Sequence, residues 1–88
     1  MDLNLNGKNA LITGASKGIG LAVAKSLAAE GCHVKLASRT ERILNAAATE
    51  IRTSYGVNAE IHVADLSQSH DREILANNCK DINILINN

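Results

Sequence analysis

Aromatic side chains are almost absent from this 88-residue sequence, which contains one Tyr, no Trp and no Phe, and it also lacks Pro. Modules that bind single-stranded nucleic acid stack bases on aromatic rings, and this chain offers no such platform. Its nine basic and nine acidic side chains cancel, so no basic field is available to hold a phosphate backbone. We therefore expect no nucleic-acid partner.

Long apolar runs, a secretory leader and cysteine-rich motifs are also missing. The apolar stretches are short and broken by Gly, Lys and Ser, whereas a membrane helix needs about 20 apolar residues. The N-terminus lacks the basic and apolar regions of a signal peptide. Cys32 and Cys79 are far apart and form neither a CxxC pair nor a metal-binding spacing with the scattered histidines. We predict two buried thiols, no metal site, no membrane partner and a cytoplasmic location.

Short β-branched runs alternate with longer helical patterns along the chain, which is typical of parallel βαβ units. The predicted order is βαβαβαβ. Strands are expected over 9–13, 33–38, 59–64 and 82–86, and helices over 18–30, from 40 to the turn at 56, and from 67 or 69 to about 79. The sequence therefore predicts an α/β fold.

The predicted helices carry regular apolar stripes and polar residues suited to capping. The expected buried stripe of the first helix recurs every four positions at Ile19, Val23 and Leu27. The alanines beside it, Ala22, Ala24 and Ala28, are expected to let the helix lie close to a sheet. Thr40 is the expected N-cap of the second helix, and either Ser67 or Ser69 that of the third.

A glycine-rich turn joins the first predicted strand to the first predicted helix. Gly14 permits a tight turn, Gly18 lets a phosphate approach the backbone, and Gly20 lets the helix pack closely. Ser16 and Lys17 add a hydroxyl and a cation beside the positive end of the helix. A glycine-rich turn without a ligand is the alternative, whereas a Walker loop is excluded because Lys17 precedes Gly18.

The segment Thr13–Gly20, with its T-G-x-x-x-G-I-G spacing, resembles the short-chain dehydrogenase/reductase family. Asp65-Leu66, the predicted strand that begins at Asp81, and Asn87-Asn88 resemble further family motifs in the same order. The resemblance implies the N-terminal βαβαβαβ portion of a Rossmann-type doubly wound parallel sheet with strand order 3-2-1-4. Residues 1–88 would then be the N-terminal part of a single NAD(P)-binding domain.

The resemblance also implies which residues bind the cofactor. It assigns the diphosphate to the glycine-rich turn, including Ile19, and the adenine to Asp65 and Leu66. A turn or an N-cap for the third helix is the alternative role of Asp65. Asn87 would lie beside the adenine ribose and tie neighbouring strands together, or would simply satisfy backbone groups at a strand end.

Ser38 and Arg39 at the end of the second predicted strand indicate NADP rather than NAD. A carboxylate there would bind the ribose 2′-hydroxyl and repel a 2′-phosphate, whereas a guanidinium binds a phosphate in two places. Lys17 could reach the same phosphate from the turn. A solvated surface charge is the alternative role of Arg39.

The catalytic Tyr-x-x-x-Lys pair of the family is not found. Tyr55 is followed by Ala59 at the fourth position and precedes Asp65, on the wrong side of the motif order, so no catalytic residue is assigned. By resemblance, the intact protein is an oxidoreductase that transfers a hydride between NADP(H) and a small carbonyl or secondary alcohol substrate, such as a 3-oxoacyl thioester. It is expected to be a homo-oligomer. The alternatives are a non-catalytic NADP-sensing protein and an inactive fragment. The isolated 88-residue chain is expected to be marginally stable, aggregation-prone or dependent on a partner, because Ile82, Ile84 and Ile86 would line an open edge of the sheet.

Overall fold

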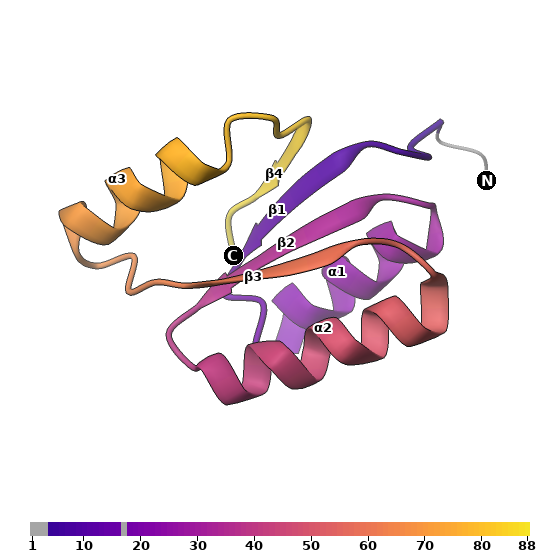
Figure 1. The fold of residues 1–88 in the computed structure, drawn as a ribbon, viewed down its shortest axis with the longest axis horizontal. Helices are drawn as coiled ribbons and strands as arrows, with labels where there is room; N and C mark the ends of the chain where they lie inside the picture. The colour runs from indigo at the N-terminus through magenta and orange to yellow at the C-terminus, as the bar shows by residue number, and fades with distance from the viewer. Residues whose placement is uncertain (1–3, 17) are drawn as a thin grey trace.

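The chain folds as one four-stranded parallel sheet with helices on both faces (Figure 1). The computed structural model describes residues 4–16 and 18–88, so Lys17 lies outside the described residues. The elements follow in the order β1 (Asn9–Thr13), α1 (Gly18–Ala29), β2 (His33–Ser38), α2 (Glu41–Tyr55), β3 (Ala59–Val63), α3 (Ser69–Asn78) and β4 (Ile84–Ile86). The sheet order β3-β2-β1-β4 confirms the predicted α/β topology.

Helices α1 and α2 cover one face of the sheet, and α3 lies on the other (Figure 1). On the α1–α2 face the sheet contributes large buried side chains, including Ile12 and Leu36, which pack against Leu44 and Ile51 of α2. The α3 face holds a smaller cluster, made of Leu11, Ala37, Leu75 and Cys79.

The buried stripe of α1 differs from the expected one. It consists of the small residues Gly20, Ala24 and Ala28, whereas the side chain of Ile19 is 75% exposed. Because α1 packs very close to the sheet, its small residues occupy the contact and the larger ones lie beside it. The predicted stripe was therefore wrong at Ile19.

The predicted helix caps are only partly confirmed. Thr40 is the N-cap residue of α2, but its side chain makes no capping hydrogen bond. The N-cap of α3 is Gln68, and neither Ser67 nor Ser69 takes that place. Ser67 is instead bonded to the carboxylate of Asp65, so its hydroxyl is engaged before the helix begins.

The fourth strand is shorter than predicted, because Asn83 pairs with Asn9 partly through its side chain and the ladder begins only at Ile84. Asn83 donates its N–H to Asn9 O, and its side-chain Oδ1 accepts the N–H of Asn9 (2.8 Å each). In the described residues β4 pairs only with β1 and forms an edge of the sheet. This agrees with the expected open edge; the side chains of Ile84 and Ile86 are half-buried, whereas Leu85 is 62% exposed.

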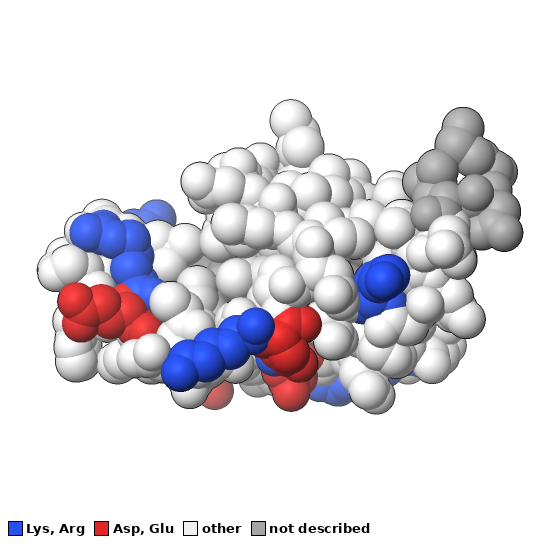
Figure 2. All heavy atoms as spheres, turned by 90° about the horizontal axis from the view of Figure 1, so that it is seen from above, with Lys and Arg blue, Asp and Glu red and all other residues white. Residues whose placement is uncertain are grey.

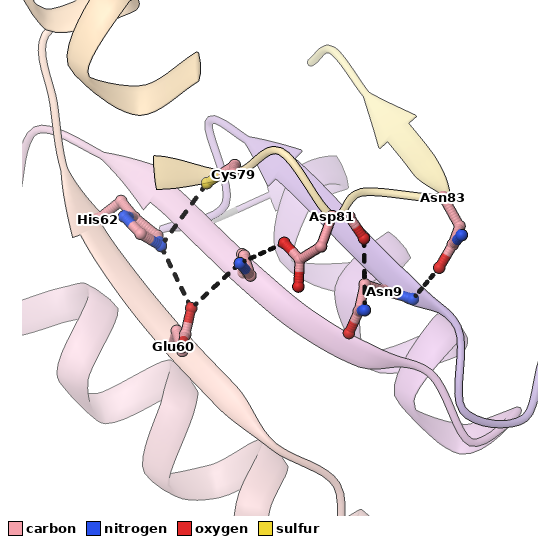
Figure 3. Close-up of polar contacts among 7 residues, drawn as sticks. Asn9, Glu60, His62, Cys79, Asp81 and Asn83 are labelled. Carbon is pink, nitrogen blue, oxygen red and sulfur yellow. Dashed lines mark hydrogen bonds and ion pairs between the residues drawn. The ribbon is translucent and has the colours of Figure 1, made fainter. Parts of the chain in front are cut away.

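Lys35 is an unusual residue in a central strand, and it is satisfied by acidic partners on the α3 face. Its Nζ lies 2.9 Å from Asp81 and 3.6 Å from Glu60. His62 Nε2 lies 3.5 Å from Glu60 and 3.8 Å from the sulfur of Cys79 (Figure 3). The thiols of Cys79 and Cys32 are both free and buried, as predicted, and burial raises the pKa of each.

Seen from the side of α3 and β4, charged side chains gather at one end and along one edge, and the middle is uncharged (Figure 2). No helix in the described part of the chain is long and apolar enough to cross a membrane.

Candidate functional site

A cavity of about 550 Å³ opens at the carboxyl ends of β1, β2 and β3. Four segments that are distant in the sequence line it: the glycine-rich turn, the end of β2 with the start of α2, the loop that follows β3, and the end of β4. The lining residues are Gly14, Ser16, Gly18, Ile19, Ser38, Arg39, Thr40, Ile43, Ala64, Asp65, Leu66 and Asn88. Ligands of open α/β sheets bind at this edge, just beyond the carboxyl ends of the strands.

The glycines of the turn are required by the backbone and by close packing. Gly14 and Gly18 have φ angles of 63° and 64°, which L side chains rarely adopt. A Cβ on Gly18 would have nothing within 4 Å, so this position is open to a ligand. A Cβ on Gly20 would collide with the carbonyl of Gly14 and lie 2.8 Å from Asn88 Nδ2. Gly20 therefore allows α1 to pack closely against Gly14 and Asn88, and it does not line the cavity.

Helix α1 begins at Gly18 beside the cavity, so the positive end of its dipole faces any ligand there. Its first turn contains no acidic residue that would compete with an anion. Ser16 lines the cavity next to this helix end. This arrangement suits a phosphate or diphosphate group.

The end of β2 supplies a cation to a second wall of the cavity. Arg39 is exposed there, immediately after Ser38, whose Oγ accepts the N–H of Thr40 at 3.4 Å. No carboxylate follows β2 before α2 begins at Glu41. The wall therefore combines a hydroxyl with a guanidinium.

Asp65 and Leu66 form the wall contributed by the loop after β3. Asp65 Oδ1 accepts hydrogen bonds from the Ser67 hydroxyl (2.7 Å) and the Ser67 N–H (3.0 Å). These bonds, with a smaller contribution from the charge of Arg39, lower the pKa of Asp65. The alternative role of Asp65 as the cap of α3 was wrong, whereas its role in a turn is observed.

Asn87 and Asn88 join the end of β4 to the end of β1. The Thr13 hydroxyl lies 3.0 Å from Asn87 Oδ1, and the Asn88 N–H donates to the same hydroxyl at 3.1 Å. Asn88 Nδ2 also donates to Gly14 O at 3.3 Å. Asn87 thus ties neighbouring strands together as expected, but Asn88 is the one that lines the cavity.

The structure brings most of the predicted binding residues to one cavity, including Ser16, Gly18 and Arg39. The sequence reasoning missed four lining residues: Thr40, Ile43, Ala64 and Asn88. In the sequence, Thr40 looks like a helix cap, Ile43 like part of an apolar helix stripe, and Ala64 and Asn88 like residues at strand ends. None of these patterns indicates that the residue lines a cavity.

Comparisons with known proteins identify the family of the chain. The profile of the short chain dehydrogenase family matches residues 8–88. The chain is 40% identical over 87 residues to the human inactive hydroxysteroid dehydrogenase-like protein 1, covering 93% of this chain and 26% of that protein. It is 44% identical over 86 residues to a very-long-chain 3-oxoacyl-CoA reductase from Meyerozyma guilliermondii, covering 93% of this chain and 25% of that protein.

A solved structure repeats the whole fold. L-sorbose reductase from Gluconobacter frateurii, complexed with NADPH and L-sorbose, superimposes with a TM-score of 0.91 at 35% identity over 100% of this chain and 35% of that one. The chain thus spans about a quarter to a third of the length of these proteins. On the match of sequence profile, relatives and fold together, the chain belongs to the short-chain dehydrogenase/reductase family.

Proposed function

We propose that residues 1–88 form the N-terminal, NADP(H)-binding part of a single dinucleotide-binding domain, and that the intact protein is a short-chain oxidoreductase. The observation that carries the proposal is the convergence of Ser16, Gly18 and Arg39 on one cavity at the carboxyl edge of the sheet. A helix end beside an open glycine fits a diphosphate, and a guanidinium one strand away fits a further phosphate.

The preference for NADP over NAD rests on Arg39. An acidic residue at the end of β2 would bind the adenosine 2′-hydroxyl and repel a 2′-phosphate, and this chain has Ser38-Arg39 there. The adenine amino group would donate to the carboxylate of Asp65, which accepts hydrogen bonds. Lys17, which was expected to reach the same phosphate, lies outside the described residues.

Titration of the intact protein with NADPH and NADH tests the proposal. We expect NADPH to bind at least about tenfold more tightly, because a charge-assisted contact to the 2′-phosphate is worth roughly 1.5–3 kcal/mol. Arg39→Asp should remove this preference, chiefly by weakening NADPH, since it replaces the guanidinium with a charge that repels the phosphate.

Arg42→Asp is the matched control. Arg42 is an exposed arginine in the first turn of α2 that does not line the cavity, so the same charge change should leave the NADPH preference intact. Equal affinity of the unmodified protein for both cofactors, unaltered by Arg39→Asp, would contradict the NADP assignment.

A bound nicotinamide supplies or accepts a hydride at C4, and we propose that the second reactant is a carbonyl or a secondary alcohol. Support comes from the reductases among the similar proteins, named for a sugar and for 3-oxoacyl-CoA. The family's Tyr-x-x-x-Lys pair would have to lie beyond the last strand, because Tyr55 has Ala59 at the fourth position. Steady-state oxidation of NADPH with oxoacyl thioesters and ketones is the direct assay.

A non-catalytic cofactor-binding protein is the second candidate. It is favoured by the 40% identity to a relative whose name describes it as inactive. The two candidates share the cofactor site and differ in the catalytic pair. NADPH binding without turnover of any carbonyl substrate, in a protein lacking Tyr-x-x-x-Lys, would support the sensor and contradict the enzyme.

A further inference from the structure

The segment between β3 and α3 crosses the mouth of the cavity with little regular structure of its own. It runs over residues 64–68 and presents Asp65 and Leu66 to the cavity. Its entry is fixed where the Ala64 N–H donates to the Ser38 carbonyl at 2.8 Å, which extends the pairing of β3 with β2. Beyond Ala64, the described residues include no neighbouring strand that bonds to this backbone.

Two side chains from the first turn of α3 hold it instead. The Asp71 carboxylate accepts the N–H of Asp65 at 2.7 Å. The Arg72 guanidinium donates to the carbonyl of Leu66 at 2.8 Å. Both distances are in the range of charge-assisted hydrogen bonds, which are roughly twice as strong as neutral ones. The end of α3 that carries Asp71 also favours a negative charge.

The hydrogen bonds from Asp71 and Arg72 act together with two further contacts to fix the Asp65–Leu66 segment. The Gln68 N–H donates to the carbonyl of Asp65 (2.9 Å), and Ser67 occupies Asp65 Oδ1. Among the described residues, Asp65 Oδ2 and the N–H of Leu66 are left without a hydrogen-bond partner. One acceptor and one donor therefore remain, which is the pair that the edge of an adenine ring requires.

We propose that Asp71 and Arg72 are positioning residues that hold Asp65 and Leu66 in the conformation that recognises adenine. The inference rests on the proposed function, because it presupposes that a dinucleotide occupies the cavity. Neither side chain lines the cavity, so each acts through the backbone that it binds. Without Asp71, the N–H of Asp65 loses its partner, so the segment is less ordered before the cofactor binds. The free energy needed to order it then reduces the affinity for the cofactor.

The test compares two cofactors in the intact protein: NADPH and its hypoxanthine analogue, in which an oxygen replaces the adenine amino group. The unmodified protein should bind NADPH about tenfold more tightly than the analogue, because the analogue places an oxygen where adenine has its amino donor and an N1–H where adenine has an acceptor for the Leu66 N–H. Asp71→Ala should reduce this ratio to about twofold or less. Asp71→Asn, which keeps an oxygen acceptor, should retain most of it, and Arg72→Ala should reduce it in part.

Glu73→Ala is the matched control, since Glu73 is an exposed carboxylate in the same helix that does not line the cavity. It should leave both affinities unchanged. A purely structural role for Asp71 would lower the affinity for both cofactors equally and leave their ratio unaltered, and that result would overturn the inference. If Asp71→Ala does not fold, Arg72→Ala serves as the test. An unchanged ratio of the affinities for NADPH and its analogue in Arg72→Ala would then overturn the inference.

The unmodified protein shows whether the proposed adenine site fails or only the positioning role of Asp71 and Arg72. Failure to bind either dinucleotide, or equal affinity for NADPH and its analogue, would contradict the proposed adenine site and the inference with it. Discrimination by the unmodified protein that persists in Asp71→Ala and Arg72→Ala would overturn the inference alone.

Discussion

The two faces of the sheet carry different kinds of side chain. Against α1 and α2 the strands present Ile12, Val34 and Leu36, each at most 1% exposed. Towards α3 the same strands present Lys35, Glu60 and His62, with a small apolar cluster beside them. The first face is held by close apolar packing, whereas the second depends on ion pairs and leaves Leu85 exposed. The contrast implies that truncating apolar groups destabilises the first face more than the second.

Truncation of a leucine on each face should give the largest effect. Leu36→Ala removes a fully buried side chain from the α1–α2 face and should cost about 3–5 kcal/mol, whereas Leu75→Ala in α3 should cost about 2 kcal/mol or less. The smaller cluster around Leu75 can relax into the space that is left. Urea unfolding followed by circular dichroism measures both values, and equal losses would show that the two faces are packed alike.

The Lys35–Asp81 pair should give a smaller effect that depends on pH. The hydrogen bond between them raises the pKa of Lys35 and lowers that of Asp81. The contribution of Asp81 is present above its unfolded pKa of about 3.9 and is lost as the pH falls through its folded value. The contribution of Lys35 is present below its unfolded pKa of about 10.4 and is lost as the pH rises through its folded value.

Asp81→Asn should therefore lower the stability at neutral pH and flatten the loss of stability in acid, so that variant and unmodified protein converge near pH 2. Thermal unfolding measured from pH 2 to 8 shows this convergence. Glu73→Gln, which removes an exposed carboxylate that makes no ion pair in the described residues, should leave the acid profile as it was. A parallel shift of the Asp81→Asn curve at every pH would contradict the electrostatic explanation.

Leu85→Lys on the open part of the α3 face should give the smallest effect. Leu85 is 62% exposed, so a charged side chain there should change the stability of the 88-residue chain by no more than about 0.5 kcal/mol. The same unfolding measurement applies. A loss above about 1 kcal/mol would mean that something covers this face and that the contrast between the faces is smaller than the structure indicates.

The sequence was sufficient for the topology because glycines and apolar runs mark each boundary. The bounds of β1 and β2 match the prediction, and Gly56 ends α2 in the left-handed conformation with φ 68°. The buried stripe of α1 was predicted only in part. The close approach at Gly20 and the alanines was expected, but apolar periodicity also gave weight to Ile19, whose large side chain lies beside the contact.

The candidate site was predictable where a local motif carries it and hidden where the tertiary structure assembles it. The glycine-rich turn, Arg39 and Asp65 follow from the sequence alone. Asn88 and Asp71 do not, because their partners are chosen by the docking of β4 and by the first turn of α3. No spacing in the sequence states that Asp71 reaches back to the backbone of Asp65.

The contact of Asn88 with Gly14 has a consequence for the order of assembly. The two residues lie 74 positions apart in the sequence, yet the side-chain amide of Asn88 donates to the Gly14 carbonyl in the glycine-rich turn. Contacts between distant parts of a chain form late in folding, after the intervening loops have closed. The glycine-rich turn therefore gains its contact with Asn88 only when β4 docks. During synthesis, a nascent chain whose β4 has not yet left the ribosome has an incomplete candidate site.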